Sequence, residues 1–134
     1  MIRKVLFLCT GNSCRSQMAE AIVNARYPEW RAFSAGTRPK GYVHPMAIQV
    51  LSEIGIEHEG VSKNVEEFRQ EKFDLVVTVC DDANEECPVW LGQGKRVHQG
   101  FRDPAKVDGT DKVKLAVFRK VRDEMVEKIP VILS

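Results

Sequence analysis

The sequence predicts an α/β protein with an open, mainly parallel four-stranded sheet and helices on both faces. Two observations predict this fold. Short apolar runs alternate with helical patterns along the whole chain without an internal repeat. One of these runs, residues 73–79, is apolar enough to be a parallel strand buried on both faces. Ligands of such folds bind at the carboxyl ends of the strands, so the loops after the strands are the candidate sites.

The first predicted unit is a strand that leads directly into a helix. Residues 3–8 form a short apolar run typical of a buried strand. Residues 16–27 follow with apolar side chains at helical spacing, and Pro28 ends the pattern. The stretch between them, CTGNSCRS at 9–16, therefore lies at the carboxyl end of a strand.

The second unit repeats this order. Residues 31–36 alternate in the manner of a strand, and residues 44–55 predict a helix. Pro45 fits the first turn of that helix, and Gly55 fits the position just past its end.

The remaining elements are two strands and a long helix. Residues 73–79 predict the third strand and residues 95–99 a weaker fourth one. From 110 to about 128 the pattern is that of an amphipathic helix packed on the sheet. Its expected apolar stripe consists of Val113, Val117, Val121 and Met125.

Composition excludes several classes of function. The 20 basic and 19 acidic side chains leave a net charge of +1, so neither nucleic acid nor an anionic membrane is an expected partner. No apolar stretch resembles a signal peptide or a membrane span, which predicts a cytoplasmic protein. We expect one domain over 1–134 and a monomer. Four cysteines without a secretion signal are expected to be reactive, metal-bound or buried rather than a disulfide framework.

The loop at 9–16 has the composition of an anion-binding site. Gly11 and Asn12 tolerate left-handed backbone angles, so backbone N–H groups can turn inward, where the following helix adds its positive end. Cys9 would become a thiolate nucleophile there, and the planar fork of Arg15 can hold two oxygens of a tetrahedral anion. Ser16 is expected to cap the helix and to donate to the sulfur. The residues expected to bind the oxyanion are Thr10, Gly11, Asn12, Ser13, Cys14, Arg15 and Ser16. The alternative is a structural turn with an inert cysteine.

With the tripeptide DPA at 103–105, this loop resembles the low-molecular-weight protein tyrosine phosphatase family, and nearly the whole chain resembles its thioredoxin-coupled arsenate reductase branch. The resemblance implies that Cys9 attacks the central atom of a bound oxyanion while Arg15 and the loop amides hold the oxygens. It implies that Asp103 protonates the leaving oxygen, which is a poor leaving group otherwise. The alternative for Asp103 is an ordinary Asp-Pro turn.

Cys80 and Cys87 favour the reductase over the phosphatase. They follow the strand at 73–79, whose carboxyl end is expected on the same face as the 9–16 loop. Arsenate, unlike phosphate, can accept two electrons from thiols. The resemblance makes Cys80 the second thiol, which displaces arsenite from Cys9, and Cys87 the third, which frees Cys9. Thioredoxin or a similar dithiol would then reduce the resulting disulfide. The alternatives are buried core cysteines or half of a zinc site, although the cysteine spacings do not match zinc motifs.

No cofactor is expected to be required, but the resemblance suggests a weak potassium site. Its residues would be Asn12, Glu20 and Ser34, completed by the segment 62–64. Asn64 stands where related proteins with this site usually have aspartate, and the loss of a carboxylate weakens a cation site. No metal role is assigned to the three histidines, which lack ligand spacing and are expected to be solvated or locally hydrogen-bonded: His44, His58 and His98.

Three functions follow from these residues. The first is arsenate reduction through Cys9, Cys80 and Cys87. The second is a phosphatase acting on phosphotyrosine or small phosphoesters, in which the two distal cysteines protect the nucleophile. Ala105 and Lys106 stand where such phosphatases tend to carry aromatic residues, which favours a small inorganic oxyanion. The third is a non-catalytic oxyanion-binding or redox-sensing module.

Overall fold

The computed structural model describes residues 1–81, 90 and 92–134. Within them, strands and helices alternate much as predicted. In chain order the elements are β1 (Arg3–Cys9), α1 (Arg15–Arg26), β2 (Trp30–Gly36), α2 (Pro45–Ser52), the 3-10 helix η1 (Val65–Phe68), β3 (Leu75–Thr78), β4 (Lys95–His98), the 3-10 helix η2 (Pro104–Lys106) and α3 (Asp111–Leu133).

The four strands form one sheet in the order β2-β1-β3-β4, and every pairing is parallel. Cys9 at the end of β1 pairs with Gly36 at the end of β2, and Leu8 pairs with Thr78 near the end of β3. The carboxyl ends of the strands therefore meet at one edge, from which the loop at 9–15 leaves. The predicted α/β fold with a four-stranded parallel sheet is confirmed. Within the described residues the expected helices on both faces are unequal, because the α-helices pack on one face and only the 3-10 helix η1 packs on the other.

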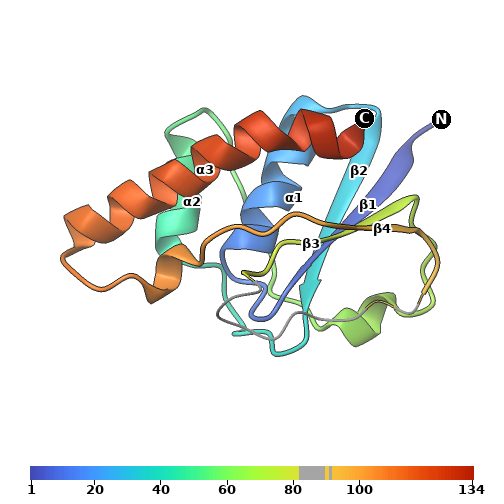
Figure 1. Cartoon of the computed structure of the whole chain (residues 1–134), viewed down its shortest axis with the longest axis horizontal. Helices are drawn as coiled ribbons and strands as arrows, with labels where there is room; N and C mark the ends of the chain where they lie inside the picture. The colour runs from blue at the N-terminus through green and yellow to red at the C-terminus, as the bar shows by residue number, and fades with distance from the viewer. Residues whose placement is uncertain (82–89, 91) are drawn as a thin grey trace.

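Each face of the sheet carries its own apolar cluster. Along β1, Val5, Phe7 and Cys9 point to one face, and Leu6 and Leu8 to the other, as the alternation of a strand requires. The first face is covered by all three α-helices, which lie together on one side of the sheet in Figure 1. The second face is covered within the described residues by η1 and by an aromatic group consisting of Phe33, Phe68, Phe73 and Trp90.

The C-terminal helix extends further than predicted. It continues through Pro130 to Leu133 instead of ending near residue 128. A proline inside a helix removes one backbone hydrogen bond, but Ile129 and Leu133 are both buried on the core, and their burial offsets that loss. Three residues of the predicted stripe lie on the core, since Val121 and Met125 are buried and Val117 packs against them, but Val113 is 48% exposed. The core contacts of the helix begin with Leu115.

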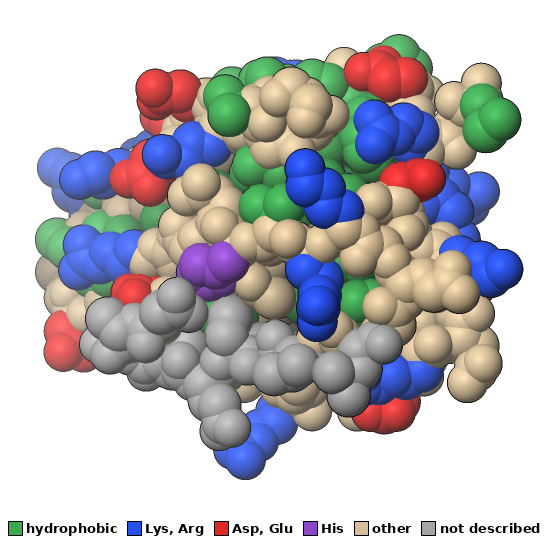
Figure 2. Space-filling view, turned by 45° about the vertical axis from the view of Figure 1, so that its right-hand side comes forward, with side chains coloured by type: hydrophobic (Ala, Val, Ile, Leu, Met, Phe, Trp, Pro, Cys, Tyr) green, Lys and Arg blue, Asp and Glu red, His purple; other side chains and the backbone are tan. Residues whose placement is uncertain are grey.

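Two further features concern the surface. None of the helices in the described part of the chain is both long enough and apolar enough to cross a bilayer. On the face shown in Figure 2, basic and acidic side chains are interspersed, in keeping with the near-zero net charge.

Candidate functional site

The loop at 9–15 joins the carboxyl end of β1 to the first turn of α1. Cys9 is the last residue of β1, Arg15 is the first residue of α1, and both are buried. The loop rests on the end of β2, because a Cβ atom at Gly36 would collide with the Thr10 carbonyl oxygen and lie 3.0 Å from the Asn12 nitrogen. The structure therefore forms the strand-loop-helix arrangement expected for an anion-binding site.

One prediction about this loop was wrong in detail. Ser16 is not the N-cap of α1: that position is Cys14, which makes no side-chain capping bond, and Ser16 is already inside the helix. The hydroxyl of Ser16 is directed instead to the nucleophile. Gly11 does not have a positive φ; of the two residues only Asn12 does, at 46°. Gly11 leaves room for the alkyl chain of Lys40, whose atoms come within 3.3 Å of the position a Cβ would take.

The Cys9 thiol has hydrogen-bond partners on two sides. Its sulfur lies 2.8 Å from the Ser16 hydroxyl oxygen, and the Asn12 backbone N–H donates to it at 3.2 Å. The Ser16 oxygen already accepts a bond from the Asn12 side-chain amide at 2.9 Å. Ser16 therefore has its own hydrogen to donate to Cys9. Both contacts hold the Cys9 sulfur, the expected nucleophile, in a fixed position at the loop.

The second thiol of the loop has a different environment. Burial, with smaller contributions from the nearby Asp103 and Cys9, raises the pKa of Cys14 to about 12. Cys14 is therefore a protonated, packed thiol at neutral pH rather than a second nucleophile. Ser13 adds a polar group, since its hydroxyl oxygen is the one buried side-chain polar atom in the described part of the chain with no hydrogen-bond partner. An orphaned hydroxyl in this loop suits an oxyanion ligand.

Arg15 and Asp103 meet across the loop although they are distant in the sequence. A terminal nitrogen of the buried Arg15 guanidinium lies 3.5 Å from the Asp103 carboxylate, and the other donates to the Phe101 carbonyl oxygen at 3.3 Å. Asp103 also accepts the Ala105 backbone N–H at 3.0 Å and caps η2. Both readings of Asp103 therefore hold: it forms the Asp-Pro turn, and it places a carboxylate beside the arginine.

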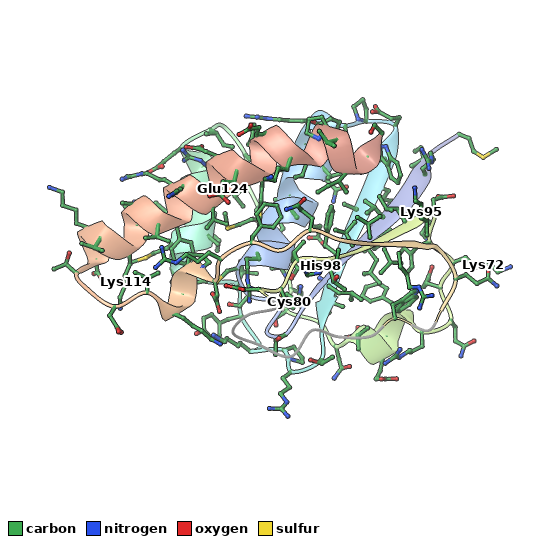
Figure 3. The ribbon with its side chains drawn as sticks, in the orientation of Figure 1. Lys72, Cys80, Lys95, His98, Lys114 and Glu124 are labelled. Atoms are coloured by element: carbon green, nitrogen blue, oxygen red, sulfur yellow. The ribbon has the colours of Figure 1, made fainter. Side chains whose placement is uncertain are left out.

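Cys80 lies next to the same loop. It follows β3 on the strand neighbouring β1, where the Val79 N–H donates to the Leu8 carbonyl oxygen at 2.9 Å. Cys80 is fully buried and disulfide-bonded, whereas Cys9 and Cys14 are free thiols. Figure 3 shows Cys80 near His98, by the carboxyl ends of β3 and β4. Cys87, the predicted third thiol, lies outside the described residues.

The residues suggested for potassium are close together but engaged with one another. The Asn12 side-chain oxygen accepts two N–H groups, from Lys63 at 2.7 Å and from Gln17 at 3.0 Å. Ser34 donates to Glu20 at 3.1 Å, and the Asn64 side chain caps η1. These oxygens are used as hydrogen-bond acceptors or donors, so the donor set does not fit a cation. Among the described residues no cluster of three or more His, Cys, Asp or Glu side chains could hold a metal.

Sequence reasoning missed a buried hydrogen-bond chain behind the loop. The Gln17 side-chain amide donates to Asn12, and its oxygen accepts a hydrogen bond from His58 Nε2 at 2.8 Å. The same His58 nitrogen lies 3.8 Å from a Glu20 carboxylate oxygen. Burial lowers the pKa of His58, so this histidine is held neutral. All three histidines are hydrogen-bonded, but only His44 bonds locally, accepting from Met46 N–H, whereas His98 is paired with Thr78 on the neighbouring strand. Because Gln17 and His58 are 41 residues apart, no spacing pattern could have joined them.

Comparison with known proteins gives two kinds of relative. The family described as low molecular weight phosphotyrosine protein phosphatase matches residues 4–133. A protein of Halalkalibacterium halodurans named arsenate reductase is 49% identical over 133 residues, covering 96% of this chain and 94% of its own. A solved arsenate reductase in its oxidized state has a TM-score of 0.76 and 30% identity, covering 98% of this chain and 96% of that one. A low molecular weight protein tyrosine phosphatase from T. tengcongensis has a TM-score of 0.74 and 27% identity, covering 96% and 95%.

Proposed function

This chain belongs to the low molecular weight phosphotyrosine protein phosphatase family, and on that premise we propose that it is an arsenate reductase. The observation that carries the proposal is that two cysteines in different redox states lie at the same edge of the sheet. Cys9 is a free thiol supported by hydrogen bonds in an oxyanion loop, and Cys80 on the neighbouring strand is disulfide-bonded. In the proposed relay Cys9 ends as a free thiol and Cys80 ends in a disulfide, which matches this arrangement.

In the first step the Cys9 thiolate attacks the arsenic atom of arsenate. A sulfur–arsenic bond forms and an arsenic–oxygen bond breaks, while the oxygen leaves as water after protonation. Asp103 is the proposed proton donor because its carboxylate lies across the loop beside Arg15. The Arg15 guanidinium and the backbone N–H groups of the loop hold the remaining oxygens. Arsenic is still pentavalent at this stage.

In the second step the Cys80 thiolate attacks the Cys9 sulfur. The Cys9–Cys80 disulfide forms, the sulfur–arsenic bond breaks, and its electron pair stays with arsenic, which leaves as trivalent arsenite. Cys87 then attacks the Cys80 sulfur and releases Cys9 as a thiolate, so the two electrons stay on arsenite and the protein ends oxidised as a Cys80–Cys87 disulfide. A dithiol protein such as thioredoxin restores both thiols. The proposal places this monomer in the cytosol, where thiol reductants are available.

Hydrolysis of phosphate esters is the second candidate activity. Phosphate and arsenate have the same tetrahedral shape, so the loop and Arg15 serve both. The favourable TM-scores to an arsenate reductase and to a phosphatase, 0.76 and 0.74, mean that the fold does not separate the two reactions. What distinguishes arsenate reduction from ester hydrolysis is the redox-active cysteine at position 80, because ester hydrolysis transfers no electrons.

The deciding experiment measures arsenate-dependent NADPH oxidation with thioredoxin and thioredoxin reductase, for the wild type, Cys80→Ser and Cys87→Ser. Hydrolysis of p-nitrophenyl phosphate by the same preparations is the control for a folded oxyanion loop. We expect multiple turnover of arsenate in the wild type only, with ester hydrolysis in all three proteins. Brisk ester hydrolysis without arsenate turnover in any of them would make the chain a phosphatase. If arsenate turnover persisted in both Cys80→Ser and Cys87→Ser, the proposed exchange between the three cysteines would be wrong.

A further inference from the structure

The Glu20 carboxylate is a largely buried charge whose nearest cation belongs to the protein itself. Glu20 lies on α1 behind the oxyanion loop, and its side chain is 12% exposed. The Lys63 ammonium is 3.8 Å from one carboxylate oxygen and donates to the Val61 carbonyl oxygen at 2.6 Å. Ser34 from β2 donates to the same carboxylate oxygen at 3.1 Å. A buried carboxylate needs such partners to remain ionised.

Lys63 is also tied to the oxyanion loop through its main chain. Its N–H donates to the Asn12 side-chain oxygen at 2.7 Å, and its carbonyl oxygen accepts the Gly36 N–H at 2.9 Å. Asn12 in turn donates to the Cys9 sulfur and to Ser16. One residue therefore links α1, the end of β2 and the loop that carries the nucleophile.

We infer that the Lys63 ammonium takes the place of an inorganic cation behind the oxyanion loop, so that this protein is independent of potassium. The donor set around Glu20 supports the inference, because its oxygens are already engaged by protein N–H and O–H groups. A potassium ion beside Glu20 would also be repelled by the ammonium group. Burial raises the pKa of Glu20, while Lys63 and Ser34 oppose that shift, as a tethered counterion should.

The test is thermal unfolding in potassium, sodium and tetramethylammonium chloride at equal ionic strength. The variants are Lys63→Met, Glu20→Gln and the double variant. Lys95→Met is the matched control, because Lys95 is exposed at the amino end of β4, away from Cys80 in Figure 3. We expect the wild-type Tm to be the same in the three salts. Lys63→Met should lower Tm by roughly 3–8 °C in every salt, and Lys95→Met should have little effect.

The double variant decides how Lys63 acts. If the ammonium serves Glu20, adding Lys63→Met to Glu20→Gln should lower Tm little further, since a neutral amide needs no counterion. A Tm of the wild type raised by potassium alone would overturn the inference. So would an equal loss from Lys63→Met in both backgrounds, which would assign the lysine to packing. Arsenate turnover in the three salts should likewise be equal for the wild type. Only this arm rests on the proposed function, and its failure would leave the Tm result intact.

Discussion

Replacing Asn12 by glycine or alanine separates two contributions of this residue to the loop. Asn12 is fully buried and has a φ of 46°, in the left-handed region. Its side chain accepts N–H groups from Gln17 and Lys63 and donates to Ser16. Glycine keeps the backbone conformation and removes these bonds. Alanine removes the bonds and in addition places a Cβ in a conformation that L-residues avoid.

The magnitudes follow from these contacts. The Lys63 N–H and the Gln17 amide each lose a buried acceptor, and a lost buried partner costs about 1–3 kcal/mol. The Gln17 amide still donates to the Val61 carbonyl oxygen at 2.9 Å, so the free-energy cost of its lost bond to Asn12 lies at the lower end of this range. We expect Asn12→Gly to lower the free energy of unfolding by about 2–4 kcal/mol. Asn12→Ala should cost about 1 kcal/mol more, because the left-handed strain exceeds the entropy it saves in the unfolded chain.

Urea unfolding followed by tryptophan fluorescence measures both variants, since Trp30 and Trp90 are buried. The m-value should be unchanged if only the folded state is affected. An Asn12→Ala protein as stable as Asn12→Gly would refute the argument from the left-handed backbone. Two variants within about 0.5 kcal/mol of the wild type would refute the argument from the buried hydrogen bonds.

Three further predictions concern single side chains. Limited alkylation at pH 7–8 should label Cys9 and leave Cys14 unlabelled in mass spectra, because burial raises the pKa of Cys14 to about 12; equal labelling would contradict this. Burial lowers the pKa of His58, so the unfolded state binds its proton more readily, and wild-type stability should fall as pH drops below about 6.5. His58→Gln should flatten that part of the urea-unfolding profile, whereas an unchanged slope would mean that another group causes it. Lys40→Met should lower kcat/KM for arsenate about two- to fivefold at low salt, since Lys40 extends over Gly11, and the difference should vanish at high salt. A salt-independent loss would point to packing instead.

The sheet was predictable because its strands carry their signal locally. Apolar runs of strand length and the alternation at 31–36 marked each strand, and the order of elements left a parallel sheet as the simple solution. The end of α3 was not predictable in the same way. A proline near residue 130 ordinarily ends a helix, and only the packing of Ile129 and Leu133 on the core explains why this helix continues.

In the candidate site, too, contacts between residues close in the sequence were predictable and contacts between distant residues were not. The contacts of Cys9 lie within one loop and its helix, so their residue types could be read from the stretch 9–16. The approach of Asp103 to Arg15 depended on topology, and the resemblance to a family supplied it before the structure did. The pair formed by Lys63 and Glu20 carries no local signal, because a lysine in a loop and a glutamate in an amphipathic helix are ordinary surface residues. The resemblance to a family brought Glu20 and the segment 62–64 together as a cation site, but only the folded chain places the Lys63 ammonium beside the carboxylate.

The close approach of Gly36 to the oxyanion loop limits how this site could be altered. The floor of the loop is main chain resting on main chain, so any side chain at position 36 would displace Thr10 and Asn12 together. Directed evolution toward larger oxyanions or esters should therefore find few solutions at the floor. Accepted substitutions should accumulate at the rim, where exposed residues such as Lys40 and Arg102 can change without moving the nucleophile. The residues at the floor of the loop thus determine its chemistry, whereas exposed residues at its rim determine which substrates it accepts.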